Sequence, residues 1–161
     1  ADYPFTTLHP NLGVVNQDNK EFVIADIPGL IEGAHEGLGL GHRFLGHVER
    51  CKGLLHLIDA TSENIKHDYL TIIKEIEAYD CNLSKKQQII VLTKSDAVKE
   101  QKINFAKEQL KKLNVQKVFG ISSVSGENII KLVRQLQELI TSMKKIEDDE
   151  DHLQEVSSWS P

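Results

Sequence analysis

The chain has 161 residues, 40% of them hydrophobic, so it can bury one sizeable core and falls within the usual size of a single domain. Its 19 basic and 24 acidic side chains give a net charge of -5, which argues against broad binding to nucleic acid through charge alone. Cys51 and Cys81 lack the spacing of a disulfide framework or zinc site, and no apolar run approaches the roughly 20 residues that cross a bilayer. We therefore expect a cytoplasmic protein without a membrane span.

Short apolar runs alternate with longer helical patterns, which is typical of an α/β protein with a mostly parallel sheet. Gly13 to Val15 can form a strand antiparallel to Phe22 to Ala25 across a polar turn. The other predicted strands are Leu54 to Ile58, Ile89 to Leu92 and Val118 to Ile121. The predicted helices are His42 to Cys51, Ile65 to Tyr79, Gln101 to Leu113 and Asn128 to Met143.

The last predicted helix is followed by a change in composition. Up to Met143, apolar residues recur at steps of three and four, which predicts that one helix face packs on the sheet. Residues 144–151 are a charge run that is too polar to bury. We therefore predict one domain over residues 1–143 and a disordered acidic tail over residues 144–161.

The residues that directly follow the predicted strands are informative, because an open parallel sheet binds its ligands beyond the carboxyl ends of its strands. Asp26-Ile27-Pro28-Gly29 follows the strand that ends at Ala25. The carboxylate of Asp26 can hold a magnesium ion through water, and the amide of Gly29 can donate to a terminal phosphate. Taken alone, such a turn is more often structural.

Two further strand ends suit a guanine base. Thr93-Lys94-Ser95-Asp96 follows the third apolar run, and Asp96 can accept from the ring N1 and the exocyclic amine of guanine while the stem of Lys94 lies across the base. Adenine lacks that pair of donors. Backbone amides of Ser122-Ser123-Val124, after the fourth run, can reach the guanine oxygen. Each motif alone is as often a plain polar loop, but their joint occurrence after successive strands favours a guanine nucleotide site.

Two segments resemble the Obg family of translational GTPases. Tyr3-Pro4-Phe5-Thr6-Thr7-Leu8-His9-Pro10-Asn11-Leu12-Gly13 is similar to the family's first switch. Asp26-Ile27-Pro28-Gly29-Leu30-Ile31-Glu32-Gly33-Ala34-His35-Glu36-Gly37-Leu38-Gly39-Leu40-Gly41-His42 is similar to its glycine-rich second switch. The resemblance covers Ala1 to about Met143 and implies a P-loop NTPase-like, three-layer α/β/α GTPase domain with a mostly parallel sheet.

The resemblance also implies a set of nucleotide-binding residues. The switch-one segment that it implies, with the Thr7 hydroxyl as a Mg2+ ligand, consists of Phe5, Thr6, Thr7, Leu8 and His9. The implied segment for the γ-phosphate and magnesium consists of Asp26, Ile27, Pro28 and Gly29. The implied guanine contacts are Thr93, Lys94, Ser95 and Asp96, with Ser122, Ser123 and Val124 as the last guanine loop.

The chain departs from the family pattern in two places and differs from Ras-like proteins in a third. It contains no Gly-x-x-x-x-Gly-Lys-Ser/Thr loop, and we expect this phosphate-binding loop and the central strand that feeds it to lie just before Ala1. Thr93 stands where the family has asparagine. Leu30 stands where Ras-like proteins place the glutamine that orients water, so hydrolysis should be slow and no catalytic residue is assigned. We expect the chain alone to bind GDP weakly and to lack GTP turnover.

The resemblance implies a monomeric GTPase that binds GTP and GDP, hydrolyses GTP slowly and acts in assembly of the large ribosomal subunit, contacting its rRNA and proteins. One alternative is a phosphoacceptor receiver domain, which Asp26, Asp59, Thr93 and Lys94 would suit at strand ends, although receivers need an acidic pair and have no use for Asp96. The other alternative is a non-catalytic interaction module that contacts the ribosome or regulators without binding nucleotide tightly.

Overall fold

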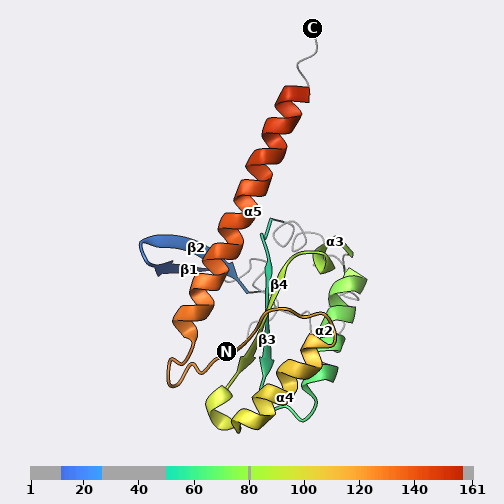
Figure 1. Cartoon of the computed structure of the whole chain (residues 1–161), viewed down its shortest axis with the longest axis vertical. Helices are drawn as coiled ribbons and strands as arrows, with labels where there is room; N and C mark the ends of the chain where they lie inside the picture. The colour runs from blue at the N-terminus through green and yellow to red at the C-terminus, as the bar shows by residue number, and fades with distance from the viewer. Residues whose placement is uncertain (1–11, 27–49, 80, 158–161) are drawn as a thin grey trace, which may run out of the picture.

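The computed structural model describes residues 12–26, 50–79 and 81–157, which form a β-hairpin, a parallel sheet and helices on both faces of that sheet (Figure 1). The elements are, in chain order, β1 (Leu12–Gln17), β2 (Lys20–Ala25), β3 (Leu54–Asp59), α2 (Ile65–Tyr79), α3 (Cys81–Ser84), β4 (Gln88–Thr93), η2 (Ser95–Ala97), α4 (Glu100–Lys111), β5 (Val118–Gly120) and α5 (Ile129–Ser157). The predicted helix over residues 42–51 falls almost wholly outside the described residues.

The hairpin of β1 and β2 confirms the antiparallel pair predicted from the sequence. Val14 lies opposite Val23, and the turn consists of Asp18 and Asn19, whose φ angles are 54° and 58°. Both residue types tolerate this left-handed conformation, and a two-residue turn of this kind matches the twist of the paired strands. The polar stretch between the two apolar runs therefore fixes the register of the hairpin.

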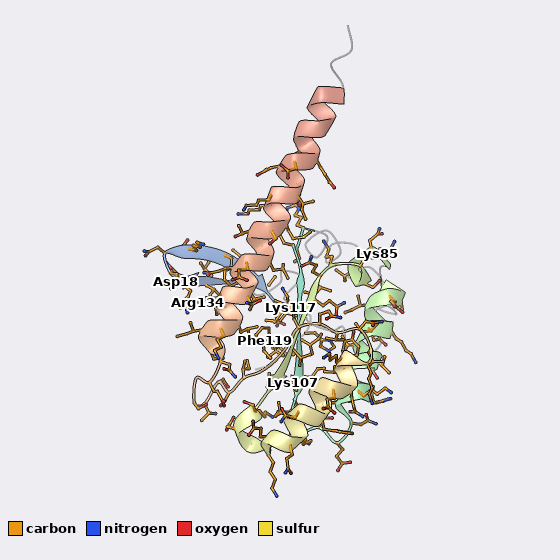
Figure 2. All side chains as sticks on the ribbon, in the orientation of Figure 1. Asp18, Lys85, Lys107, Lys117, Phe119 and Arg134 are labelled. Carbon is orange, nitrogen blue, oxygen red and sulfur yellow. The ribbon has the colours of Figure 1, made fainter. Side chains whose placement is uncertain are left out.

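The hairpin is fastened at its turn to α5. The guanidinium of Arg134 donates from Nε to Asp18 Oδ2 at 2.9 Å and from Nη2 to Asp18 Oδ1 at 3.4 Å. Gln137, one turn further along the helix, donates from Nε2 to the carbonyl oxygen of Gln17 at 2.8 Å. Figure 2 shows Arg134 of α5 beside Asp18 of the turn. These contacts join segments more than 110 residues apart in the sequence.

The strands β3, β4 and β5 form a parallel sheet in that spatial order. Asp59 lies opposite Thr93, and Leu92 lies opposite Gly120, so the carboxyl ends of the three strands meet at one edge. Each strand lies within one residue of its predicted bounds, and α2 has its predicted bounds. The sequence prediction of a parallel α/β arrangement is confirmed for this sheet.

The core lies on both faces of this sheet, and β4 supplies its centre. Ile90 and Leu92 face α2 and α4, whereas Ile89 and Val91 face α5, and all four side chains are at most 1% exposed. Because side chains alternate along a strand, a continuous apolar run is what a strand covered on both faces requires. The result is a helix layer, a sheet and a second helix layer, as predicted.

The segment that leads into β3 lies very close to α5. A Cβ atom on Gly53 would lie 2.7 Å from Cδ2 of Leu139 and 3.0 Å from the carbonyl oxygen of Gln87. Real carbon contacts of this kind are longer, so the close approach of α5 to this end of the sheet requires glycine.

The helix α5 continues to Ser157, so the prediction of a disordered tail from residue 144 is wrong for residues 144–157. The segment contains no glycine or proline, and its lysine, glutamate and leucine residues favour a helix. Its charge shows that it is exposed, not that it is unfolded. Lys52 forms an ion pair with Glu147, and the rest of the helix projects beyond the other elements (Figure 1). Within the described ranges no helix is long and apolar enough to span a membrane.

Candidate functional site

The candidate site lies at the edge of the parallel sheet where β3, β4 and β5 end. Asp59 is the last residue of β3, the loop 93–96 follows β4, and the loop 122–127 follows β5. The parallel register brings together these segments, which are far apart in the sequence. The sequence predicted that the second and third of these segments belong to one site, and this arrangement places them at neighbouring strand ends.

The loop after β4 has a defined backbone conformation. Lys94 has φ 56° and ψ 37°, in the left-handed region, and the short helix η2 begins directly after it. The amide of Ser95 donates to the carbonyl oxygen of Ile121 at 3.0 Å, and the amide of Ala97 donates to that of Lys94 at 3.0 Å. The Ser95 hydroxyl is buried without a hydrogen-bond partner among the described residues, so this side chain turns inward.

Asp96 differs from its neighbours in this loop. Its side chain is exposed, and no hydrogen bond or ion pair engages it within the described part of the chain. The hydroxyl of Thr93, by contrast, donates to the carbonyl oxygen of Ile58 at 3.4 Å and so links β4 to β3. The loop therefore presents one carboxylate outward with its acceptor capacity unused.

Lys94 is paired with Asp59, a contact that the sequence reading missed. Lys94 Nζ lies 2.6 Å from Asp59 Oδ2, while the amide and hydroxyl of Thr61 donate to Asp59 Oδ1 at 2.9 and 2.6 Å. The hydrogen bond from Lys94, followed by those from Thr61, holds the pKa of the Asp59 carboxyl well below its usual range. The signal in the sequence was the position of both residues at the ends of successive predicted strands.

The loop after β5 is closed on itself by its own hydrogen bonds. Ser122 is fully buried, its hydroxyl accepts from the amide of Ser125 at 3.1 Å, and its carbonyl accepts from the amide of Gly126 at 2.9 Å. Gly126 has φ 76°, which glycine adopts without strain. Among the described residues the amides of Ser123 and Val124 have no acceptor, and Val124 is 89% exposed.

These two loops together offer a mixed set of hydrogen-bonding groups. Asp96 supplies a charged acceptor, and the amides of Ser123 and Val124 supply donors. No side chain of the loop after β5 other than that of Ser122 is buried, so the loop is held by backbone and serine contacts and not by an apolar core. Such an edge can bind a planar ligand that carries both donors and an acceptor.

The phosphate and metal residues predicted from the sequence are only partly within the described chain. Asp26 directly follows β2 and is exposed, whereas Phe5, Thr6, Thr7, Leu8 and His9 and also Ile27, Pro28 and Gly29 lie outside the described residues. Among the residues described, no group of three or more histidine, cysteine or acidic side chains could hold a metal ion. A single exposed carboxylate fits a magnesium ion that is held through water, since Mg2+ keeps several of its waters in proteins.

A groove separates the hairpin from the parallel sheet. It has a volume of about 1460 Å³, and its walls include β1, β2 and β3 with apolar side chains of α2 and α5, among them Leu57, Ile72, Leu136 and Ile140. Asp26 and Asp59 also line it. Within the described residues β2 pairs only with β1, and β3 pairs only with β4, so the expected mostly parallel sheet is here divided into two sheets.

Solved structures of GTPases share this fold. Era, in complex with MgGDPNP and nucleotides 1506-1542 of 16S ribosomal RNA, has a TM-score of 0.60 and 24% identity, over 83% of this chain and 45% of Era. Elongation factor SelB of Methanococcus maripaludis, in complex with GppNHp, has a TM-score of 0.56 and 15% sequence identity, over 84% of this chain and 28% of SelB. A putative nucleolar GTP-binding protein 1 of Plasmodium falciparum has a TM-score of 0.63 and 17% sequence identity, over 91% of this chain and 78% of the Plasmodium chain.

These likenesses confirm the predicted GTPase-like α/β fold, and this chain spans less than half the length of Era and of SelB. The profile of a family described as ethanolamine utilisation - propanediol utilisation matches residues 57–138. The profile of the 50S ribosome-binding GTPases matches residues 1–94, which include the hairpin, β3 and β4. The receiver alternative has no support from these matches. The chain belongs to the family of 50S ribosome-binding GTPases.

Proposed function

We propose that this chain is the guanine-reading part of an Obg-type GTPase that hydrolyses GTP slowly and acts in assembly of the large ribosomal subunit. The observation that carries the proposal is the combination, at neighbouring strand ends, of the exposed carboxylate of Asp96 with the amides of Ser123 and Val124, which have no acceptor among the described residues. The family match to 50S ribosome-binding GTPases supports the ribosomal part of the proposal.

The hydrogen-bonding pattern suits guanine better than adenine. Guanine presents two donors, the ring N1–H and the exocyclic amine, which one carboxylate can accept together. It also presents a carbonyl oxygen, which backbone amides can reach. Adenine has an amine where guanine has this oxygen and lacks the N1 proton. Both contacts would therefore become mismatched, and a buried mismatch of this kind costs about 1 to 3 kcal/mol.

The phosphate end of the site rests on the resemblance to Obg proteins. In this proposal Asp26 holds Mg2+ through water, Thr7 supplies a hydroxyl ligand, and the segments Phe5 to His9 and Ile27 to Gly29 contact the nucleotide. The ion would offset the negative charge of the phosphates. Thr93 stands in place of the family's asparagine, and its hydroxyl donates a hydrogen bond to the carbonyl oxygen of Ile58, so a contact between β4 and β3 remains at this position.

We further propose that the phosphate-binding loop and its strand come from a segment of the protein outside residues 1–161. The groove between β2 and β3 supports this proposal, because both strands border it and neither has a second partner among the described residues. A strand placed there would join the two sheets and satisfy backbone groups on both edges. Asp26 and Asp59 line the same groove, so the strand would end beside the candidate site.

The test uses the full-length protein in a calorimetric titration with GDP and with ADP in the presence of Mg2+. We expect GDP to bind at least about 100-fold more tightly than ADP, because a site built for hydrogen-bonding groups rejects ligands that leave them unpaired. Equal affinities would contradict the guanine assignment. Hydrolysis of GTP, followed as phosphate release, should be slow and should require Mg2+.

The ribosomal part has a separate test. Purified large and small subunits are sedimented with the protein in the presence of GDP or of a non-hydrolysable GTP analogue. We expect sedimentation with the large subunit to be stronger with the analogue, since switch segments order around a γ-phosphate. Preference for the small subunit would contradict the large-subunit proposal. Binding to the large subunit without measurable nucleotide binding would favour the non-catalytic interaction module instead.

A further inference from the structure

Asp59 and Lys94 form an ion pair at the edge of the sheet that carries the candidate site. The two atoms, Lys94 Nζ and Asp59 Oδ2, are 2.6 Å apart, which is a close charge-assisted hydrogen bond. The second carboxylate oxygen accepts two hydrogen bonds from Thr61. Because these bonds hold the carboxylate in one orientation, the ammonium group is directed to one place.

The backbone of Lys94 is in a conformation that lysine seldom adopts. Its φ of 56° and ψ of 37° lie in the left-handed region, which costs a residue with a Cβ atom on the order of 1 kcal/mol or more. The strain is maintained by ordered neighbours, since the amide of Ala60 donates to the carbonyl of Thr93 and the amide of Ser95 donates to that of Ile121. Strain of this kind is common where a side chain must be aimed at a ligand.

Asp96 is a second carboxylate in this loop, two residues after Lys94. Asp59 engages the ammonium, whereas Asp96 has no partner among the described residues. A lysine stem is flexible and its ammonium has no preferred geometry, so Lys94 would otherwise be free to pair with Asp96. A lysine bound to Asp96 would occupy the acceptor that the base needs.

We propose that Asp59 is a positioning residue of the guanine site: by binding the ammonium of Lys94, it fixes the lysine stem as a wall of the base pocket and leaves Asp96 available to the base. The inference rests on the proposed function, because it assumes that Asp96 accepts from guanine. It adds a residue outside the two guanine loops and gives the lysine a defined orientation before the nucleotide arrives.

The experiment compares Asp59→Asn, Lys94→Met and the double variant in the full-length protein. Asparagine keeps the size of the side chain and an oxygen for Thr61 but loses the charge that holds Lys94. Glu147→Gln is the matched control, because it also converts a carboxylate that pairs with lysine into an amide, far along α5. Binding of GDP and of inosine diphosphate, which lacks the exocyclic amine, is measured for each protein, together with the melting temperature.

In Asp59→Asn we expect GDP affinity to fall about tenfold and the preference for GDP over inosine diphosphate to fall toward unity, because Lys94 then competes for Asp96. In Lys94→Met the affinity falls but the preference stays, since no ammonium competes. In the double variant the preference returns to that of Lys94→Met, and Glu147→Gln changes neither quantity. A purely structural role of Asp59 would change the melting temperature alone.

The outcomes separate this inference from the proposed function. If the unsubstituted protein prefers GDP over ADP but Asp59→Asn keeps the preference for GDP over inosine diphosphate, the positioning role is wrong and the guanine site stands. If the unsubstituted protein does not distinguish GDP from ADP, both proposals are wrong. If Asp59→Asn does not fold, the double variant and Lys94→Met decide: loss of the preference in Lys94→Met would overturn the inference.

Discussion

The parallel sheet and the β-hairpin are stabilised in different ways. In the sheet, β4 is covered by helices on both faces, and its central residues are at most 1% exposed. In the hairpin, Leu12 and Val14 are each 68% exposed and Val23 is 58% exposed, while Phe22 is the one buried hydrophobic residue of these strands. The hairpin depends on its own ladder and on its contacts with α5.

This difference corresponds to the two ends of the proposed nucleotide site. The loops that would read the base follow strands of the well-packed sheet, so they are held in place by the core. The segments that resemble the two switches flank the hairpin in the sequence. A region with few buried apolar contacts opens at low free-energy cost, and segments that move in switching proteins are drawn from such regions. The base-reading end should therefore be rigid and the hairpin end adaptable.

The largest expected difference between the two regions is in the free energy of unfolding when a leucine in each is replaced by alanine. Leu92→Ala removes a side chain that is fully buried in β4 and should lower the free energy of unfolding by about 2 to 5 kcal/mol. In the chain of residues 1–161, Leu12→Ala in β1 removes a side chain that is 68% exposed and should change the free energy of unfolding by less than about 0.5 kcal/mol. Urea unfolding of both variants tests the comparison. Similar losses in both would mean that the hairpin is as well packed as the sheet.

The stability of the protein should also depend on pH, because His56 is buried in β3 of the sheet. This side chain is 8% exposed and stacks on Tyr69 at a centroid distance of 5.6 Å, and its Nδ1 has no hydrogen-bond partner among the described residues. Burial lowers its pKa from 6.5 to about 4. Because the unfolded chain binds a proton more readily, the stability that the neutral histidine contributes is complete above pH 6.5 and is lost as the pH falls toward 4.

Between pH 6.5 and pH 4 the free energy of unfolding should fall by about 2 to 3 kcal/mol because of His56. His56→Leu keeps an apolar side chain of similar length and removes the titrating group, so its unfolding free energy should vary less between pH 6.5 and 4. The measurement is urea unfolding at several pH values in that range. Parallel curves for the two proteins would show that His56 is not the group responsible. His67→Leu, at an exposed histidine of α2, is the matched control variant.

The smallest expected effect on stability is that of the contact between Arg134 of α5 and Asp18 of the hairpin turn, which we call the hairpin anchor. Arg134→Ala removes the hydrogen bonds to Asp18, so the amides of the hairpin should exchange with solvent several-fold faster while global stability hardly changes. Lys131→Ala, also exposed on α5, is the control. The hydrogen bond from Arg134 lowers the pKa of Asp18, so the anchor is intact above pH 3.8 and weakens below it. Unaltered exchange in Arg134→Ala would show that the strand ladder alone holds the hairpin.

The sequence predicted features that depend on local pattern. The continuous run Ile89 to Leu92 predicted a strand of a parallel sheet, and the polar stretch Asn16 to Asn19 predicted a turn between two short strands, of which Asp18 and Asn19 form the turn. The guanine loops were found because Thr93-Lys94-Ser95-Asp96 and Ser122-Ser123-Val124 directly follow predicted strands of a parallel sheet, where such sheets bind their ligands. Their assignment to a nucleotide site stays a prediction, as do the segments Phe5 to His9 and Ile27 to Gly29.

The features that the sequence did not predict depend on distant contacts. The pairing of Asp59 with Lys94 follows from the register of β3 and β4, which no local pattern contains. Charge patterning marked residues 144–157 as exposed but could not separate an exposed helix from a disordered tail. The inward turn of Ser95 and the full burial of Ser122 likewise depend on the packing between neighbouring loops.

The central claim is that Asp96 reads guanine, and one substitution tests it most directly. Asp96→Asn in the full-length protein replaces a two-acceptor carboxylate with an amide that donates, and it should weaken GDP binding by about one to two orders of magnitude, or about 1.5 to 3 kcal/mol. The amide can donate to the additional carbonyl of xanthine, so xanthosine diphosphate should bind the variant better than GDP does. Unchanged GDP affinity, with no gain for xanthosine diphosphate, would contradict the account.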